Sequence, residues 1–465
     1  MSMKSKETLA QLQDNQGRFL DINHSYVLLD DDYDKELLRL VSSSTISDLC
    51  SDQLLVYPQS FNQGDGGCRV LEYVERGVDF PAVVYTNNIM GFIGRGDTDI
   101  FIHSRFSKEN DDYFLHYMLM RVAGLNVFDF ETSAIKTKDN WGDFLIYLFP
   151  MVLQRALRRG ILKSYVSRKY NNANLKGKID LARHIRLNKP TTGHIAYSVR
   201  EYSADNIVIQ LVRHCLEFLQ HHKVGRVILN SDTEIKKAVR LIKELTPSYK
   251  ASELQQVIAK NRKTFIHPLY AEYCPLQQLC VAILEHRKVS YGVDKNKIHG
   301  ILFDGAWLWE EYIGIVLQDL MEHRKRYDEK RKIYLLEKGD NKKGFQEIIP
   351  DFINKEEKVV GDAKYSMLQG KTNLKSGQAE AIYYKTIMYM YRFQSTKGFL
   401  FYPIKQGFEA PILEDFKIVD TEGHLYKVGL PIAETTSFKE FCTQMQDSEA
   451  IFKSEIARLM SVKNN

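Results

Sequence analysis

Two acidic residues and a lysine in the last third of the chain have the types and spacing of a catalytic centre. One apolar run ends in Pro350-Asp351, and a second, eleven residues further along, ends in Asp362-Ala363-Lys364. Two carboxylates on neighbouring strands can hold one hard cation such as Mg²⁺ through oxygen ligands. Because side chains alternate along a strand, Lys364 faces the same side as Asp362, where it can position a water and stabilise charge on a phosphate. The pattern indicates a metal-dependent centre that hydrolyses phosphodiester bonds in nucleic acid.

The same residues have a simpler explanation, in which Asp351 and Asp362 are solvated acids at strand ends and Lys364 pairs with one of them. Apolar residues precede both acids, so the acids lie at the ends of buried strands, where charged residues need a reason. This favours the catalytic interpretation. A third acid is expected from the preceding helix, where Glu310 and Glu311 are adjacent. Only one of them can face the strands; we prefer Glu310, and a surface position for both stays open.

The elements expected around these residues follow a regular order. Periodicity and turn signals predict an amphipathic helix over 304–322, strands at 332–336, 345–353 and 358–364, a helix over 377–393 and a strand at 398–403. The tail adds another strand or two and a helix near 437–460. The order α-β-β-β-α-β is that of the PD-(D/E)xK restriction-endonuclease-like core, so the acids and the lysine lie in the element order that this chemistry requires.

The remaining two-thirds of the chain have other patterns. Residues 1 to about 125 are β-rich, with a helix near 35–49 and strand-like runs at 69–74, 82–85 and 99–103. Helical periodicity follows at 144–157, 207–219 and 231–245. We therefore predict a mixed α/β fold with three regions: a β-rich N-terminal region (1–125), a mainly helical middle region (126–295), and a nuclease domain with a C-terminal extension (296–465).

The composition predicts a globular protein inside the cell. Hydrophobic residues make up 44% of the 465 positions and aromatic residues 11%, which leaves little room for disorder. The six cysteines are scattered without the spacing of a zinc site, as expected for reduced thiols. The N-terminus lacks the apolar core of a signal peptide, and the longest apolar run, 144–153, is too short to span a membrane. We expect a soluble, cytoplasmic protein.

Basic residues concentrate in three places, although the net charge of +5 is mild, and DNA contact is expected at two of them. The stretch 155–189 is rich in lysine and arginine; a solvated surface or an acidic partner explains it as well as DNA phosphates do. Arg324 and Arg326 belong to a basic run at a helix end, where they also complement the helix dipole. Lys371 and Lys375 lie in the polar loop after the second acidic motif, where they can touch the DNA backbone.

That polar loop also contains a false nucleotide-binding signal. Gly370-Lys371-Thr372 resembles the end of a phosphate-binding P-loop, but the motif requires glycine five residues before Gly370, and Tyr365 stands there. We therefore expect this chain to bind no nucleoside triphosphate by itself.

Several further segments resemble McrC, the nuclease subunit of McrBC-type restriction systems, including the LlaJI-like branch. They are 91–105, 157–165, 175–180, 202–206, Leu308-Trp309-Glu310 and 384–389, so the resemblance covers roughly residues 85–405. Leu308-Trp309-Glu310 is similar to the "LFE" helix of that family, which supports Glu310 over Glu311. Lys385 stands where the family usually has glutamine, so its role is left open.

The resemblance implies a partner, a separately encoded AAA+ GTPase of the McrB type. In that family the McrB-like subunits form a ring, bind GTP and recognise DNA, while the N-terminal part of McrC docks on the ring and stimulates GTP hydrolysis. Residues 1–125 are accordingly expected to be the partner-docking region. The roles of residues 1–84 and of the tail after residue 405 are left open, because both match less clearly.

Together these features predict the Mg²⁺-dependent, double-stranded-DNA endonuclease subunit of a GTP-driven restriction complex. Asp351 and Asp362 would bind the metal with the Ala363 carbonyl, Glu310 would complete the acidic set, and Lys364 would position the attacking water. The products would carry 5′-phosphate ends, as is usual for this fold. Two alternatives stay open: a stand-alone repair nuclease of the same fold, and a nuclease-inactive activator of a partner motor.

Overall fold

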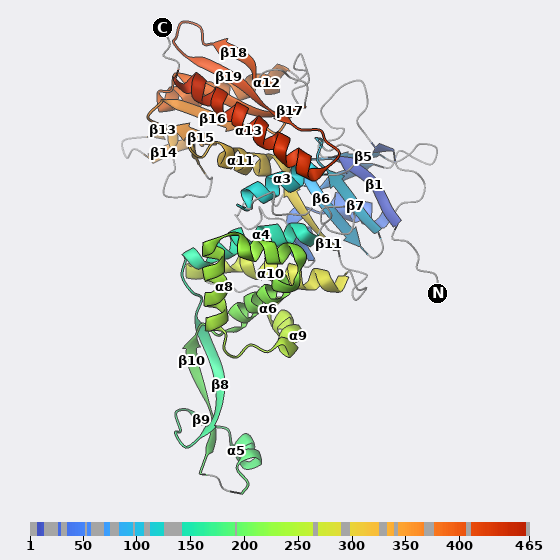
Figure 1. Ribbon diagram of the computed structural model, residues 1–465, viewed down its shortest axis with the longest axis vertical. Coiled ribbons are helices and arrows are strands. Elements are labelled where there is room, and N and C mark those ends of the chain that lie inside the picture. Colours follow the sequence, from blue (N-terminus) through green and yellow to red (C-terminus); the bar gives the residue numbers. More distant parts are fainter. Residues whose placement is uncertain are drawn as a thin grey trace. The chain divides into compact units, whose positions relative to one another are not determined.

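The computed structural model describes residues 7–13, 27–28, 35–51, 54–56, 69–74, 83–95, 98–106, 112–124, 142–190, 193–263, 268–289, 298–324, 333–338, 343–366, 376–405 and 411–461. It divides into two compact units (Figure 1). One combines Met1–Phe144 with Val293–Asn465, and the other is Leu145–Gly292. The first and last of the three predicted regions thus share one unit, a grouping that the sequence did not predict. The roles assigned to the three regions stay predictions.

A five-stranded sheet in the order β1-β7-β6-β11-β3 forms the N-terminal part of the first unit. Its strands are β1 (Glu7–Gln13), β3 (Leu54–Val56), β6 (Ile89–Arg95), β7 (Thr98–His103) and β11 (Ile298–Asp304). β11 follows the whole second unit in the sequence, yet it pairs antiparallel with β6 and parallel with β3. Gly91 has a φ of +132°, and a Cβ there would lie 2.1 Å from the Ile301 carbonyl oxygen. The close approach of β6 and β11 therefore requires glycine.

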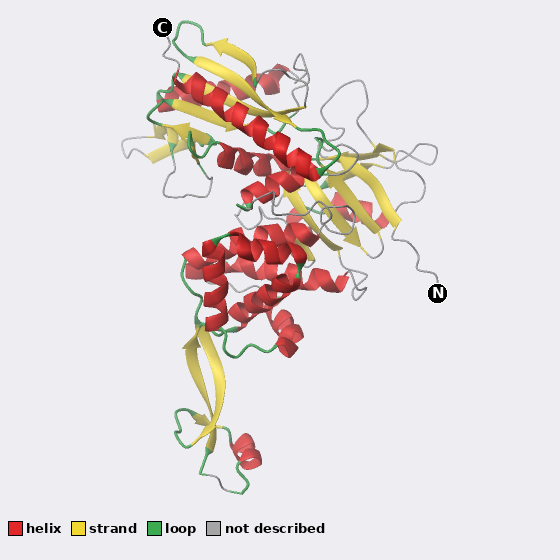
Figure 2. Cartoon of the chain, viewed as in Figure 1, coloured by secondary structure: helices red, strands yellow, loops and turns green. Residues whose placement is uncertain are grey.

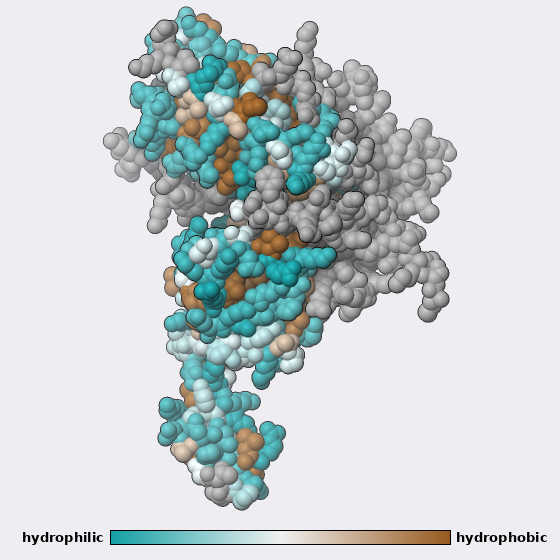
Figure 3. All heavy atoms as spheres, viewed as in Figure 1, coloured by the Kyte–Doolittle hydropathy of each residue, from teal (hydrophilic) through white to brown (hydrophobic). Residues whose placement is uncertain are grey.

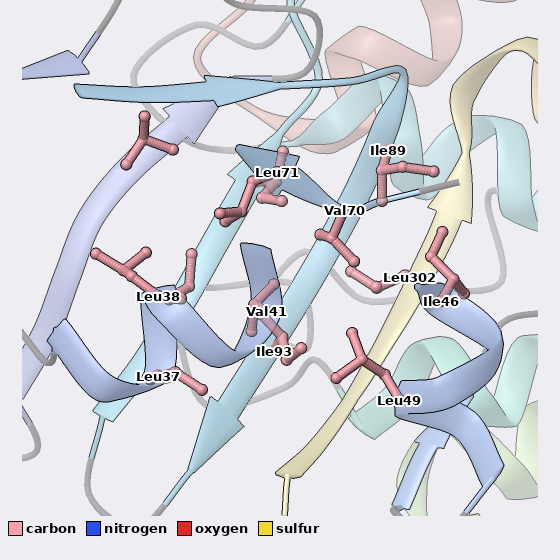
Figure 4. Packing of buried hydrophobic residues seen from close by; sticks show 13 residues of the cluster. Leu37, Leu38, Val41, Ile46, Leu49, Val70, Leu71, Ile89, Ile93 and Leu302 are labelled. Carbon is pink, nitrogen blue, oxygen red and sulfur yellow. The ribbon is translucent and has the colours of Figure 1, made fainter. Parts of the chain in front are cut away.

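Two helices, α1 (Lys35–Ser43) and α2 (Ile46–Ser51), pack against this part of the unit (Figure 4). Their apolar side chains share one buried cluster with the sheet and with the small sheet of β2 (Val27–Leu28), β5 (Val83–Thr86) and β4 (Leu71–Val74). Leu302 of β11 belongs to this cluster.

The single helix predicted over 35–49 was wrong. The Asp48 carboxylate accepts a 3.1 Å hydrogen bond from the Thr45 N–H, and the Thr45 hydroxyl accepts a 3.2 Å bond from the Asp48 N–H. This reciprocal capping box starts the second helix.

The second unit is a helical bundle with a protruding arm (Figure 2). Its helices are α4 (Gly142–Arg158), α6 (Ile207–His221), α7 (Lys223–Ser231), α8 (Thr233–Leu245), α9 (Leu254–Asn261) and α10 (Tyr273–Val289), with 3-10 turns at Ala251–Glu253 and Pro268–Tyr270. Helix α6 contacts α7, α8, α9 and α10, so it is the centre of the bundle. Asn206 caps its start by accepting from the N–H groups of Val208 and Ile209.

The arm is a β-ribbon within the region predicted to be mainly helical. It consists of β8 (Ser164–Asn172), β9 (Lys178–Ile179) and β10 (Ile195–Ser203) with the short helix α5 (Leu181–Leu187). Part of its basic charge is used internally, since Arg168 pairs with Asp205 at 3.0 Å and Arg183 donates to the Tyr197 carbonyl. Apolar side chains are exposed among hydrophilic ones toward its far end (Figure 3): Leu175, Ile179, Leu181, Ile185 and Leu187.

A six-stranded mixed sheet in the order β12-β15-β16-β17-β19-β18 forms the C-terminal part of the first unit. The strands are β12 (Glu322–His323), β15 (Phe352–Asn354), β16 (Val359–Ala363), β17 (Lys397–Lys405), β18 (Ile412–Lys417) and β19 (His424–Ile432). The accompanying helices are α3 (Tyr113–Val122), α11 (Gly305–Val316), α12 (Ser376–Phe393) and α13 (Phe438–Ser461). Helix α12 packs on Leu400 and Tyr402, while Phe452 of α13 packs edge-on against Phe401, so the helices cover both faces.

Two predicted elements of this part were wrong in detail. The strand predicted at 345–353 is two strands, because Pro350 lacks an N–H and the chain leaves one ladder to enter another. The first piece, β14 (Lys343–Glu347), pairs with β13 (Tyr334–Lys338) in a hairpin separate from the six-stranded sheet. That hairpin includes most of the strand predicted at 332–336. The helix predicted over 304–322 ends at Val316.

Among the described residues, no helix combines the length and apolar character needed to cross a bilayer.

One buried histidine should make the first unit sensitive to acid. Burial lowers the pKa of His116 in α3 to about 4, although the nearby Asp112 carboxylate acts in the opposite direction. In the unfolded chain histidine titrates near 6.5, so between pH 6.5 and 4 the unfolded state binds more protons and the free energy of unfolding falls as pH falls. We expect a loss of about 3 kcal/mol over this window. In His116→Gln, the free energies of unfolding measured with urea at pH 7 and pH 4.5 should differ by less than they do in wild type. A pH dependence equal to that of wild type would contradict this assignment.

Candidate active site

The central strand β16 carries the second acidic motif into the interior of the sheet. β16 lies between β15, which is antiparallel to it, and β17, which is parallel. Val359 and Val360 are buried at its start, and Asp362 has no exposed surface. Lys364 follows directly after the strand, and its N–H donates to the Phe401 carbonyl of β17 at 2.8 Å. Its ammonium group contacts the Asp362 carboxylate, in agreement with two side chains on the same face of one strand.

Asp351 lies directly before β15 and is tied to the second motif. Its carboxylate accepts a hydrogen bond of 2.8 Å from the N–H of Ala363, and only 7% of the residue is exposed. Its own carbonyl accepts a 2.8 Å bond from the N–H of Arg324, which follows β12. The Ala363 bond therefore joins the two motifs directly, and the Arg324 bond holds Asp351 from the other side.

Two neighbouring carboxylates, those of Asp362 and Glu310, disfavour the ionisation of Asp351. Burial raises the pKa of Asp351 well above its usual range, and the carboxylates of Asp362 and Glu310 raise it further. Lys364 and the Ala363 N–H act in the opposite direction. Two buried acids with a third nearby form a set of oxygen donors whose mutual repulsion a bound cation would offset.

Helix α11 presents Glu310 to this set. The Asp304 carboxylate caps the helix by accepting from the N–H groups of Ala306 and Trp307. The indole N–H of Trp309 donates to the Phe401 carbonyl at 3.2 Å, which anchors the helix on β17 beside the Lys364 backbone bond. The Glu310 carboxylate is near enough to Asp351 to raise the pKa of that acid, and its role at the site stays a prediction.

Two residues at the site were not predicted from the sequence. His323 of β12 lies with its Nε2 3.2 Å from Oε1 of Glu310, and its ring occupies space left by the missing side chain of Gly314. Lys385 of α12 lies with its Nζ 3.5 Å from Oδ1 of Asp362. The sequence signal for His323 was Gly314, a glycine inside an apolar helix. The signal for Lys385 was a lysine where the family usually has glutamine.

The oxygen donors at the site, among them the carboxylates of Asp351 and Asp362, are of the kind that a hard cation prefers. Across the described part of the chain, no three side chains of His, Cys, Asp or Glu converge as a ready-made metal cage. Asp362 Oδ2 is buried and contacts the Lys364 ammonium. A Mg²⁺ ion normally keeps several waters and takes one or two carboxylates, so Asp351 and Asp362 are the residues that could hold such an ion, and the Ala363 carbonyl could be a further ligand.

The residues predicted to touch DNA are only partly described. Arg324 lies at the end of β12, where its backbone supports Asp351. Arg326, Lys371 and Lys375 lie outside the described residues. The structure therefore brings together Glu310, Asp351, Asp362, Ala363 and Lys364, with Arg324 next to them.

Comparisons with known proteins give one family match and several similar solved structures. A family model described as "McrBC 5-methylcytosine restriction system component" matches residues 84–403. One similar solved structure is a refined half-complex from a tetradecameric assembly of Thermococcus gammatolerans McrB AAA+ hexamers with bound McrC; it is 15% identical over 95% of this chain and 100% of that one, with a TM-score of 0.43. The T. gammatolerans McrBC complex is 17% identical over 69% and 90%, with a TM-score of 0.29. A comparison with curated proteins found no match.

Proposed function

The chain belongs to the McrBC family of 5-methylcytosine restriction system components, and from this we propose that it is the Mg²⁺-dependent DNA endonuclease subunit of a GTP-driven restriction complex. One observation carries the proposal: Asp351, Asp362 and Lys364 meet at the ends of two adjacent strands, with Glu310 beside them. Buried acids and a lysine in this arrangement are costly for stability, so a chemical role explains them better than a structural one.

Each residue of the set has a role that follows from its position. Asp351 and Asp362 would hold Mg²⁺ with the Ala363 carbonyl, and bound Mg²⁺ supplies a Lewis acid for the phosphate and acidifies its waters. Lys364 lies against Asp362 with 22% of its side chain exposed, so it can reach a water or a phosphate oxygen outside the buried pair. Glu310, paired with His323, would accept hydrogen bonds from waters around the acids.

The fold supports the same chemistry. α11, β12, β15, β16, α12 and β17 follow one another in the chain around the acids, with the hairpin β13–β14 inserted between β12 and β15. This is consistent with a PD-(D/E)xK core, for which hydrolysis leaving 5′-phosphate ends is usual. The resemblance of the sequence to McrC implies an McrB-like AAA+ partner that binds GTP and selects the DNA.

Cleavage assays with and without a partner test this proposal. Methylated and unmethylated plasmids are incubated with the chain and Mg²⁺, alone or with the McrB-like GTPase and GTP. Cleavage is expected only in the complete mixture. Cutting by the chain alone would favour a stand-alone nuclease, and GTPase stimulation without any cutting would favour a nuclease-inactive activator.

Lys385 should contribute less than Lys364 to the same reaction. It lies further from Asp362, at 3.5 Å, and 41% of its side chain is exposed. Lys385→Gln should slow cleavage about tenfold, because a partly solvated cation near the phosphate is lost while the metal ligands stay. The matched change Lys355→Gln, on the exposed turn between β15 and β16, should have no effect. Equal rates for the two variants would exclude a role for Lys385.

A further inference from the structure

The residue after Lys364 is buried in the N-terminal sheet of the same unit. Tyr365 is 5% exposed, and its hydroxyl lies 3.0 Å from Ser104 Oγ and 3.4 Å from Met90 Sδ. Its ring meets Phe106 edge-on, with centroids 5.6 Å apart. Met90 belongs to β6, while Ser104 and Phe106 follow β7. The chain therefore passes from the catalytic strand directly into a pocket of side chains about 260 residues earlier in the sequence.

Arg105 closes this pocket over the tyrosine ring. Its guanidinium lies 4.7 Å from the ring centroid, and Nη1 reaches the Tyr365 carbonyl oxygen at 3.5 Å. Its Nη2 donates to Oδ1 of Asn88 at 2.6 Å. The backbone carbonyl of Asn88 in turn accepts a 2.7 Å bond from the N–H of Gly305. Arg105 is itself 8% exposed, so the ring and the guanidinium are held without competition from water.

Gly305 brings the helix that carries Glu310 into the same contact. It is the first residue of α11, and a Cβ built on it would lie 2.6 Å from Cε1 of Tyr365. The start of the helix therefore rests on the tyrosine ring. Tyr365 therefore follows Lys364 in the sequence and also directly contacts α11, the helix that carries Glu310.

We propose that Tyr365 is a positioning residue for cleavage, held by Ser104, Arg105 and Gly305, and that the N-terminal sheet is thereby part of the catalytic centre. The proposal rests on the nuclease function proposed above. Because Tyr365 is fixed directly after Lys364, it limits where the Lys364 ammonium can lie. Its contact with Gly305 also fixes the start of α11, and through the helix the position of Glu310 relative to Asp351. Reacting groups misplaced by about 1 Å can lose about 100-fold in rate, so such a contact has a large effect without touching substrate.

Two substitutions of Tyr365 separate the hydroxyl from the ring. In the full chain with its partner, Tyr365→Phe keeps the ring and should lower the single-turnover rate about fivefold, whereas Tyr365→Leu should lower it about 100-fold. DNA affinity measured in Ca²⁺ and the half-saturating Mg²⁺ concentration should both stay within about twofold of wild type. A purely structural role would instead lower the active fraction, leaving the rate per folded molecule unchanged. Tyr273→Phe, which removes a buried, hydrogen-bonded hydroxyl in the second unit, is the matched control and should cleave normally.

Gly305→Ala tests the contact from its other side and replaces Tyr365→Leu if that variant does not fold. It removes no hydrogen bond, yet it must displace the ring, so a loss of about tenfold or more in rate at unchanged DNA affinity is expected. Wild-type rates in both Tyr365→Leu and Gly305→Ala, with Lys364→Ala inactive, would overturn the positioning role and leave the nuclease function intact. If the wild-type chain itself does not cleave with partner, GTP and Mg²⁺, the proposed function fails and the inference fails with it.

Discussion

Asp362→Asn should lower the DNA cleavage rate by a factor on the order of 10³ or more without unfolding the protein. Asp362 is one of the two carboxylates proposed to hold the metal, and it is fully buried in the central strand in contact with both Lys364 and Lys385. Asparagine keeps the volume and removes the charge that a cation needs. The change also removes repulsion from Asp351, so in EDTA the thermal midpoint should be equal to or above that of wild type.

The control for this variant is Asp319→Asn, which changes an exposed carboxylate of the same unit that pairs with Lys453. It should cleave at the wild-type rate. Added Mg²⁺ should raise the thermal midpoint of wild type and of Asp319→Asn but not that of Asp362→Asn. Residual cleavage by Asp362→Asn above one-tenth of wild type would remove this residue from the metal site.

Glu449→Ala should cause the largest loss of stability in the first unit. The Glu449 carboxylate, on α13, accepts hydrogen bonds from the hydroxyls of Tyr117 at 2.8 Å and Tyr312 at 2.7 Å, and from Arg121 at 2.8 Å. Tyr117 and Arg121 belong to α3 and Tyr312 to α11, so one acid joins three helices. Its removal leaves two buried hydroxyls and a cation without their acceptor, and a loss of about 3–5 kcal/mol is expected.

Urea unfolding followed by near-UV circular dichroism measures this effect. Glu449→Gln keeps one carbonyl acceptor and should lose less stability than Glu449→Ala. Glu440→Ala, at an exposed position in the first turn of the same helix, should lower the midpoint far less, because only a favourable contact with the helix dipole is lost. If Glu449→Ala and Glu440→Ala unfold at the same urea concentration, the network does not hold the helices together.

The acids and the lysine were predictable because their signal is local. Apolar residues with β-branched side chains precede Asp351 and Asp362, and Lys364 follows at the spacing of one strand face, so a short window of sequence contains the whole pattern. The capped apolar helix α11 is equally local, and the "LFE"-like segment distinguished Glu310 from Glu311. These inferences about position needed no long-range pairing.

The features that were missed depend on contacts between distant segments. β11 completes a sheet whose other strands precede the second unit, and Tyr365 inserts among residues 88–106, yet neither pairing leaves a periodic signal. The arm was missed because neither face of its ribbon is fully buried; along β8 exposed and half-buried residues alternate without an apolar side. Hydrophobic periodicity detects one buried apolar face, and in the three strands of this ribbon only the adjacent residues Ala196 and Tyr197 are buried.

The most direct test of the account compares wild type with Lys364→Ala on covalently closed plasmid, in the complete mixture of chain, McrB-like partner, GTP and Mg²⁺. We predict that wild type converts the plasmid to linear and shorter products carrying 5′-phosphate ends, while Lys364→Ala, at equal GTPase stimulation, leaves it closed. EDTA should abolish the wild-type reaction. Plasmid cleavage by Lys364→Ala at the wild-type rate would contradict the assignment of this site as the nuclease centre.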